Sequence, residues 1–391
     1  MQVHLQHRPL RAAAGRGRCA VPAPFSGHAT PRQQQQRVAM CHAAAQLQMR
    51  DVIEMLIDKK DLTEPQAEQT LTSLLDEFSP EQAAAFLVLL RAKGETPSEI
   101  AGLAKAMLER GVRVNVGQPV VDIVGTGGDG IGSVNISTGA SVVAAAGGAR
   151  VAKHGSRSVS SLCGSADVIE ALGVAVELGP EGVAGCVREA GIGFMYAPTY
   201  HPAMRMLRGV RGALKVRTAI NMLGPLLNPA HAEYGLVGVY STDISHLMAD
   251  SLLRLGVRKA LVVHSAGLDE LTPMAPADVV EVVAGGRANH YTLDPQKLGI
   301  PRCKVEDLAG GDAALNASIL RDVFGGARGA VADALNLNAG VALAAAQVVA
   351  TPADGVALAQ EVQRAGKAGD VLKKWIESSQ KHASAEAVAK R

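Results

Sequence analysis

Residues 120–153 read VVDIVGTGGDGIGSVNISTGASVVAAAGGARVAK, and this stretch decides the fold. Its first five residues are typical of a buried strand, and the glycines that follow them are typical of a tight loop. The Ala/Val run 138–146 predicts a helix, and 150–153 predicts a second short strand. A strand, a loop, a helix and another strand in this order predict an α/β domain with a mostly parallel central sheet.

The chain on the C-terminal side continues this pattern. Residues 235–240 and 260–264 predict further strands, and the helical pattern 246–255 separates them. Most of 329–349 and 353–378 predicts helix.

The chain on the N-terminal side predicts short helices with clear ends. A hydroxyl residue stands three positions before a Gln or Glu at three places, as in a capping box. Two glycines are placed to end the second and third helices in the left-handed conformation. The predicted caps are Thr63, Ser79 and Thr96, and the predicted glycine ends are Gly94 and Gly111.

Length and composition fit a two-domain α/β enzyme. The 391 residues are 48% hydrophobic and 3% aromatic and include 42 glycines. We expect an N-terminal helical domain over 49–115, which part of the later chain can join, and an α/β catalytic domain over 116–391. No stretch approaches the roughly 20 uninterrupted apolar residues of a membrane helix, so no membrane partner is expected. The five cysteines show neither a CxxC pair nor zinc spacing and are interpreted as reduced thiols.

The first 48 residues differ from the rest of the chain. Residues 1–50 hold seven arginines and no acidic residue, which leaves 32 basic and 37 acidic residues in the remainder. An Arg-rich, acid-free leader without a continuous apolar core is typical of an organelle transit peptide rather than a secretory signal. A disordered tail is the alternative interpretation. The acidic remainder lacks the basic character of a general nucleic-acid binder, so no nucleic-acid partner is expected.

Two polar segments are candidates for binding phosphate. The glycines of 125–130 let backbone N–H groups approach an anion, and 135–138 (NIST) open a helix at the positive end of its dipole. Segment 153–167 follows a strand and combines Lys153, Arg157 and several hydroxyls, which suit phosphate oxygens. Taken singly, the first also resembles a structural turn and the second a solvated basic loop. Neither Walker nor Rossmann glycine spacing is present.

Two further segments suggest a metal site and a carboxylate site. Asp269 and Glu270 follow the strand predicted at 260–264, where adjacent carboxylates can hold Mg²⁺. An exposed acidic pair is the alternative. Residues 200–211 and 221–229 predict a rigid loop with a nearby cation, which suits a carboxylate. His201 is interpreted as a hydrogen-bonded core histidine.

Taken in order, VGTGGDG, NIST, KHGSRSVSSLCGSAD, GPLLNPA and HSAGLDE resemble the motif series of the anthranilate phosphoribosyltransferases. The resemblance runs from about Val52 to the C-terminal helices, and 191–230 is most similar to plant and algal members, which fits a plastid (stromal) location. The family implies a small helical domain hinged to a larger α/β domain of the nucleoside phosphorylase/phosphoribosyltransferase type, usually in a homodimer through the helical part. It also implies transfer of the phosphoribosyl group of 5-phosphoribosyl 1-diphosphate to the amine of anthranilate, with Mg²⁺, in tryptophan biosynthesis.

The resemblance assigns a site to each ligand. Lys153 and Arg157 would stabilise the charge that develops on the leaving diphosphate, and no nucleophile is expected because the aromatic amine is already neutral and nucleophilic. Ser137, Asp269 and Glu270 would bind Mg²⁺, and Gly125, Ser156 and Arg211 would contact anthranilate. The phosphoribosyl diphosphate site would comprise Gly125, Gly128, Asp129, Ser133, Asn135, Ser137, Thr138, Lys153, His154, Gly155, Arg157, Ser158, Ser160, Ser161 and Ser165.

The chain departs from the family pattern at Ser156, where the family usually has Asn in contact with anthranilate. Two other functions compete with the transferase. A pyrimidine nucleoside phosphorylase would be expected to show a KHSTGG-type motif, which is absent. A non-catalytic nucleic-acid-binding relative would be expected to show a basic groove and a disrupted acidic pair, whereas Asp269 and Glu270 are both present.

Overall fold

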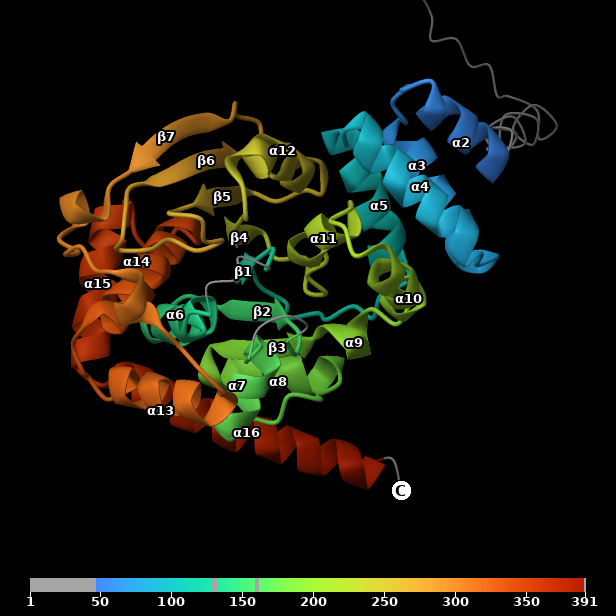
Figure 1. Cartoon of the computed structure of the whole chain (residues 1–391). Helices are drawn as coiled ribbons and strands as arrows, with labels where there is room; N and C mark the ends of the chain where they lie inside the picture. Colours follow the sequence, from blue (N-terminus) through green and yellow to red (C-terminus); the bar gives the residue numbers. More distant parts are fainter. Residues whose placement is uncertain (1–46, 128–131, 159–161, 390–391) are drawn as a thin grey trace, which may run out of the picture. The chain divides into compact units, whose positions relative to one another are not determined.

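The strand predicted at 120–124 is β1, an interior strand of a seven-stranded sheet (Figure 1). The computed structural model describes residues 47–127, 132–158 and 162–389, and Leu47–Arg391 form one compact unit. The sheet order is β3-β2-β1-β4-β5-β6-β7, parallel from β3 to β5 and antiparallel at β6 and β7. The strands are β1 Val121–Gly125, β2 Val151–Gly155, β3 Ile192–Tyr196, β4 Tyr234–Gly238, β5 Lys259–His264, β6 Ala277–Val283 and β7 Asn289–Leu293.

Side chains alternate between the two faces of the sheet, as the strand period of two requires. On β4, Leu236 belongs to one apolar cluster and Val237 to the other. The first cluster contains α6 (Ile136–Ala146) and α14 (Ala330–Ala345), and the second contains the N-terminal helices. The sheet therefore separates two cores, and its parallel part is covered on both faces.

The N-terminal helices begin largely where their caps predict. Thr63 and Thr96 form complete capping boxes, and the Ser79 side chain accepts from the backbone N–H of Gln82. Gly94 ends its helix with φ 95°, as predicted. The prediction for Gly111 is wrong, because Arg110 ends that helix in the right-handed region and Gly111 has no positive φ. A Cβ at Gly111 would lie 3.0 Å from His201 Nδ1, so close packing explains this glycine.

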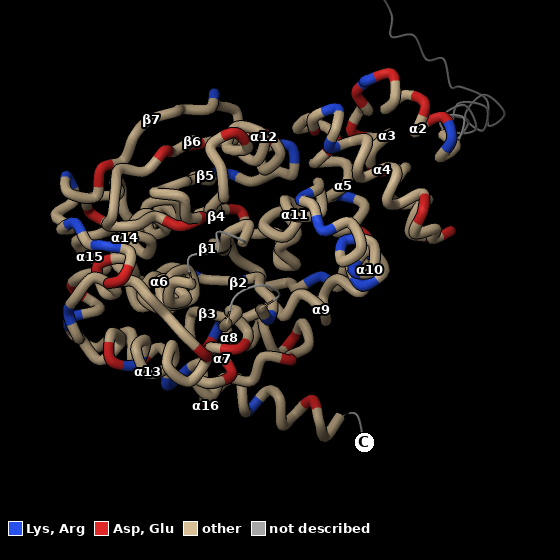
Figure 2. The backbone as a smooth tube through the Cα atoms, viewed as in Figure 1, with Lys and Arg blue, Asp and Glu red and all other residues tan. Residues whose placement is uncertain are grey.

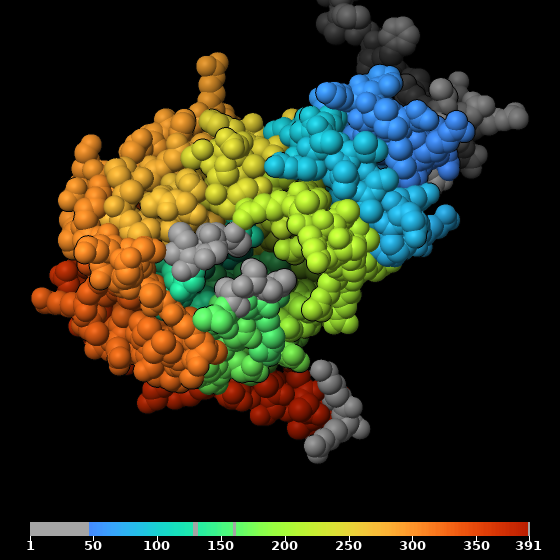
Figure 3. Space-filling view, viewed as in Figure 1, coloured from blue at the N-terminus to red at the C-terminus, as the bar shows by residue number. Residues whose placement is uncertain are grey.

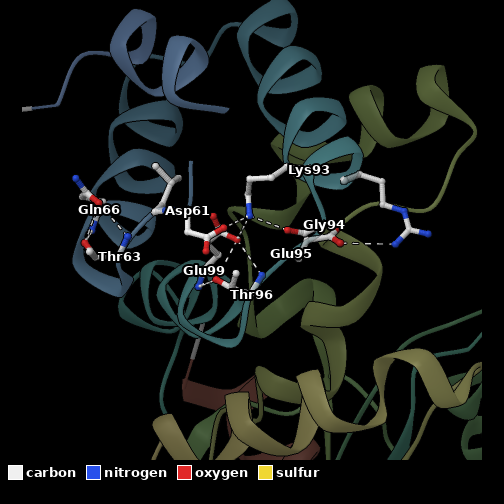
Figure 4. A network of polar contacts seen from close by, with 10 residues as sticks. Asp61, Thr63, Gln66, Lys93, Gly94, Glu95, Thr96 and Glu99 are labelled. Atoms are coloured by element: carbon white, nitrogen blue, oxygen red, sulfur yellow. Dashed lines mark hydrogen bonds and ion pairs between the residues drawn. The ribbon is translucent and has the colours of Figure 1, made fainter. Parts of the chain in front are cut away.

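A buried polar network holds the N-terminal helices together (Figure 4). Glu99 is fully buried and accepts from the backbone N–H groups of Leu62 and Thr96, each at 2.8 Å. Lys93 Nζ lies 3.0 Å from Glu99 and 2.7 Å from Asp61. These bonds connect the turn before α3 to the turn before α5. The four helices are α2 Met49–Ile57, α3 Glu64–Asp76, α4 Pro80–Lys93 and α5 Pro97–Glu109.

Three later helices pack on this group. Their apolar residues share one core with the N-terminal helices, and this core also includes one face of the sheet. Helix α10 contacts α4, and both α11 and α12 contact α5. Their bounds are α10 Met204–Leu214, α11 Ile220–Leu223 and α12 Ser245–Arg254.

The C-terminal helices belong to the first apolar cluster, on the face of the sheet opposite to the N-terminal helices. The predicted helix over 353–378 is two helices, since Gly366 takes φ 72° between them. Helix α16 lies along α8, and the carboxylate of Glu386 accepts from the backbone N–H of Gly179 before α8. No helix of the described residues has the length and apolar character to cross a membrane. The remaining helices are α7 Ser165–Ala171, α8 Pro180–Ala190, α9 Ala197–Tyr200, α13 Ala313–Phe324, α15 Pro352–Arg364 and α16 Lys367–Ala389.

Candidate active site

Lys153 is the buried cation of the site. It lies on β2 with only 2% of its surface exposed, and its Nζ donates to Ile123 O at 2.6 Å and to Ser137 Oγ at 3.3 Å. Burial lowers the pKa of Lys153, while the carboxylates of Asp122 and Glu270 oppose this shift. Lys153 therefore lies between carboxylates at the C-terminal edge of the parallel strands, where ligands bind in open α/β sheets.

The acidic pair Asp269 and Glu270 meets this cation. Glu270 Oε1 accepts from the backbone N–H of Ser137 at 3.1 Å, in the first turn of α6. Burial and repulsion from Asp269 raise the pKa of Glu270 to about 8. The carboxyl group of Glu270 thus lies at the positive end of this helix, beside the segment predicted to bind phosphate.

Two neighbouring glycines let Asp269 lie against the strand ends. Gly125 of β1 and Gly238 of β4 are in register, and a Cβ on either would collide with Asp269. Gly127, with φ 73°, donates its backbone N–H to Asp269 Oδ2 at 2.5 Å. The predicted glycine loop therefore approaches the predicted acidic pair through backbone contacts.

The donor set suits a hard divalent cation. Asp269, Glu270 and Ser137 offer oxygen atoms, and the two carboxylates repel each other. No group of three or more His, Cys, Asp or Glu in the described ranges could hold a metal ion. Mg²⁺ commonly binds through one or two carboxylates and takes its other ligands from water and substrate phosphates, so these residues fit it.

Arg157 is engaged by α7. Its guanidinium lies 3.0 Å from Asp167 Oδ1 and 2.8 Å from Glu170 Oε2, and these bonds raise its pKa. Asp167 Oδ2 also accepts from the backbone N–H groups of Ser158 and Gly164. The second predicted cation is therefore neutralised by two carboxylates in this structure.

Two histidines pack beside the 224–228 segment. His154 Nδ1 lies 3.2 Å from Gly224 O, and His201 Nε2 lies 2.6 Å from Leu227 O. The two rings meet edge to face with their centroids 5.1 Å apart. Burial lowers the pKa of both, to about 3 for His154. Both rings are neutral at physiological pH, and His201 is the hydrogen-bonded core histidine that the sequence predicts.

Two of the residues assigned to anthranilate, Ser156 and Arg211, lie on different elements. Ser156 follows β2, and its carbonyl accepts from the backbone N–H of Ala166 at 3.2 Å. Arg211 is exposed on α10, which also exposes Arg205 and Arg208 (Figure 2). In Figure 3 the surface is hollowed between the green segment that contains β2 and the yellow-green segment that contains α10.

The remaining predicted residues of the phosphoribosyl diphosphate site lie near the start of α6, at the start of α7, or outside the described residues. Asn135 precedes α6 and donates to Cys163 O at 3.1 Å, while Ser133 forms a backbone bridge with Ala309. Thr138 is buried, and Ser165 opens α7, where its Oγ lies against Gly155. Gly128, Asp129, Ser160 and Ser161 lie outside the described residues.

Sequence analysis missed two buried residues that hold the site. Asp122 accepts from Asn228 Nδ2 at 2.7 Å and from the backbone N–H of His154 at 3.3 Å. Asn338 of α14 binds both the N–H and the carbonyl of Leu271, directly after the acidic pair. An acidic residue inside the apolar run VVDIV was the available signal for Asp122. Asn338 showed no such signal in the sequence, because its partner Leu271 lies far from it along the chain.

Comparisons with known proteins agree along almost the whole described chain. A family model for the helical bundle domain of a glycosyl transferase family matches residues 50–111, and the α/β domain model of this family matches residues 117–369. The chain is 43% identical over 329 residues to the anthranilate phosphoribosyltransferase of Chlamydia felis, covering 84% of this chain and 96% of that protein. It is 45% identical over 336 residues to that of Rubrobacter xylanophilus, covering 85% and 98%.

Solved structures of similar proteins have the same fold. The anthranilate phosphoribosyltransferase from Thermus thermophilus aligns with a TM-score of 0.81 and 44% identity, over 84% of this chain and 99% of that one. The Saccharomyces cerevisiae protein of that name, in complex with PRPP and Mg, aligns with a TM-score of 0.78 and 26% identity, over 85% and 98%. These alignments support a helical domain followed by an α/β domain with a mostly parallel sheet.

Proposed function

The chain belongs to the anthranilate phosphoribosyltransferase family, and we infer that it transfers the phosphoribosyl group of 5-phosphoribosyl 1-diphosphate to the amine of anthranilate. The products are N-(5-phosphoribosyl)anthranilate and diphosphate, and the pathway is tryptophan biosynthesis. The meeting of Lys153, the start of α6 and the Asp269–Glu270 pair at one sheet edge carries this conclusion. A cation, a helix N-terminus and paired carboxylates are what a diphosphate with its divalent metal requires.

The reaction exchanges one bond at C1 of the ribose. The C1–oxygen bond to diphosphate breaks with its electron pair going to the diphosphate, and the amine nitrogen supplies the pair for the new C1–nitrogen bond and then loses a proton. Lys153 and the N–H groups of α6 stabilise the charge that develops on the leaving group. Arg157 adds to this stabilisation when its guanidinium leaves Asp167 or Glu170 and binds the diphosphate instead.

Ser137, Asp269 and Glu270 would hold Mg²⁺. When bound, it neutralises diphosphate charge. Burial and, after it, repulsion from Asp269 raise the pKa of Glu270, and a cation between the two carboxylates would relieve that repulsion, which supports this assignment. The yeast relative was solved in complex with PRPP and Mg, which supports Mg²⁺ as the metal of the reaction.

The first experiment follows the loss of anthranilate fluorescence by the full chain with phosphoribosyl diphosphate. We expect loss of signal with Mg²⁺ and none after EDTA treatment, with recovery when Mg²⁺ is restored. A folded chain that leaves anthranilate unchanged in saturating Mg²⁺ would disprove the proposed function.

Anthranilate contacts Gly125, Ser156 and Arg211. Replacing Ser156 with Asn adds an amide of longer reach at a position where family members contact anthranilate with it. We expect S156N to lower the KM for anthranilate about fivefold, as one additional hydrogen bond of about 1 kcal/mol allows. The KM for phosphoribosyl diphosphate is the internal control, and an unchanged anthranilate KM would remove Ser156 from this site.

The chain forms a homodimer through its helical part. Helix α4 is apolar on most of its surface, and its Val88 is 41% exposed, while Ile57 of the neighbouring α2 is 58% exposed. Contiguous exposed apolar residues are typical of a protein interface, and these two residues would form part of it. Light scattering should give twice the mass of one chain, and the double variant I57E/V88E should give the mass of one. A monomeric wild-type chain would contradict this proposal.

The chain is a plastid protein of the plant and algal type, and its first 48 residues direct import. Their composition, with six arginines and no acidic residue, supports this, and the family models begin to match at residue 50. A fluorescent protein fused to residues 1–48 should enter isolated chloroplasts, whereas a fusion with all of its arginines replaced by glutamine should not. Uptake by mitochondria alone would show that residues 1–48 direct import into mitochondria and not into plastids.

A further inference from the structure

Asp122 is the acidic residue of the otherwise apolar strand β1, and its surface is only 4% exposed. Its Oδ1 accepts from the backbone N–H of His154 at 3.3 Å on the neighbouring strand β2. Its Oδ2 accepts from Asn228 Nδ2 at 2.7 Å, in the loop before β4. One carboxylate thus connects two strands and a loop.

Asn228 completes the connection. Its Nδ2 also donates to Ala152 O at 2.8 Å, and its Oδ1 accepts from the backbone N–H of Ala230 at 2.9 Å. The loop that it holds begins with the carbonyls of Gly224 and Leu227, which bind the two neutral histidine rings. A shift of this loop would therefore move both rings.

A cavity of about 120 Å³ lies behind the loop. Pro225, Leu226 and Asn228 line one part of it, and Leu252 and Leu255 line another. This space is partly open, and the bonds of Asp122 and Asn228 hold the loop beside it.

We propose that Asp122 is a positioning residue for the transfer reaction, whose carboxylate holds the 224–228 loop and the His154 backbone and so fixes the wall where the acceptor binds. The proposal rests on the proposed function, since residues 221–229 are taken as the acceptor side of the site. Asp122 contacts neither substrate itself. It acts through Asn228 and His154.

The polarity of the hydrogen bonds provides a sharp test. Asp122 offers two acceptors to two donors, the His154 N–H and the Asn228 amide. In D122N one of these donors faces an NH₂ group, and in N228D two carboxylates face each other. The exchange D122N/N228D restores both bonds, with the new amide at position 122 donating to the new carboxylate at position 228. It loses the donation to Ala152 O and places a carboxylate oxygen against that carbonyl, so the rescue is partial.

We expect D122N to raise the KM for anthranilate about tenfold, as loss of one buried hydrogen bond implies. The KM for phosphoribosyl diphosphate should rise less, through the loss of the Asp122 charge beside Lys153. The D122N/N228D exchange should restore part of the anthranilate KM. Thermal melts confirm that each variant is folded at the assay temperature. If D122N fails to fold, the exchange variant alone decides, by a KM for anthranilate that rises more than the KM for phosphoribosyl diphosphate.

Q363L is the matched control. Gln363 is equally buried, and its amide donates to Val323 O and Ala327 O in the C-terminal helices. Q363L should lose stability and leave both KM values unchanged. Equal changes of both KM values in D122N, or no rescue in the exchange variant, would overturn the proposal. An inactive wild-type chain would instead refute the proposed function.

Discussion

His154 shows how burial fixes the state of a single residue. Its pKa of about 3 lies below the value of about 6.5 for the unfolded chain, so below pH 6.5 the unfolded state binds a proton that the native state does not. The stability that the neutral ring contributes is complete above pH 6.5 and is lost as the pH falls. The loss between pH 7 and pH 5 is about 2 kcal/mol from this group, and His201 adds to it with the same sign.

Urea titrations at pH 7 and pH 5 measure this loss. We expect H154N to show a smaller difference between the two pH values than the wild-type chain, whatever its stability at pH 7. An equal difference in both proteins would show that other groups are responsible.

Lys215 ends α10 in a conformation that favours glycine. Its φ is 50°, in the left-handed region, and its Cβ makes that region costly. We expect K215G to raise the free energy of unfolding by about 0.5–1 kcal/mol. The control is K373G in the exposed interior of α16, which should lower it by about 1 kcal/mol. Destabilisation by K215G would indicate that the lysine side chain makes a compensating contact.

Some of the segments that the sequence singled out lie together in the structure. The glycine loop, Ser137 and the Asp269–Glu270 pair converge at one edge because parallel strands bring their ends together. Residue-level prediction failed for Asp122 and Asn338, since their partners become neighbours only after folding. The ion pairs of Arg157 were also beyond the sequence, because they depend on the direction of α7.

Helices α8 and α16 stabilise each other at their ends. Glu386 of α16 accepts from the Gly179 N–H at the start of α8, where the helix dipole favours a negative charge. Glu189, near the end of α8, accepts from Ser378 and Lys381 of α16. The two helices are thus joined at both ends by side chains from opposite parts of the sequence.

Removing the contact between Glu386 and the Gly179 N–H should weaken the packing of α16 on α8. We expect E386A to lower the free energy of unfolding by about 1 kcal/mol, through loss of a capping carboxylate. E377A in the same helix is the control, because Glu377 is exposed and caps no helix. Equal effects of the two substitutions, measured by urea unfolding, would contradict the capping role.

Element prediction depended on local signals. Hydroxyl caps located the helix starts, and apolar runs located β1, β2, β4 and β5 within one or two residues. Strands β3, β6 and β7 were not predicted. Strand β7 reads NHYTL and lies at the sheet edge with much of its surface exposed, so it lacks the apolar run of a buried strand.

At the scale of the whole molecule, the helical part is discontinuous in sequence. Its core includes Leu207 and Val210 of α10, Ile220 of α11, and Met248 and Leu252 of α12. We expect the fragment 47–115 to lack a cooperative thermal transition by circular dichroism, since these partners are missing. The full chain is the comparison, and a cooperative transition in the fragment would show that its four helices suffice.

This discontinuity has a consequence during synthesis. The ribosome makes the chain from its N-terminus, so α2 to α5 leave the exit tunnel before α10, α11 and α12 exist. Their apolar faces remain uncovered while the first three strands are translated. Nascent chains therefore carry an aggregation-prone surface through the middle of translation, and this is the period in which they depend most on chaperones.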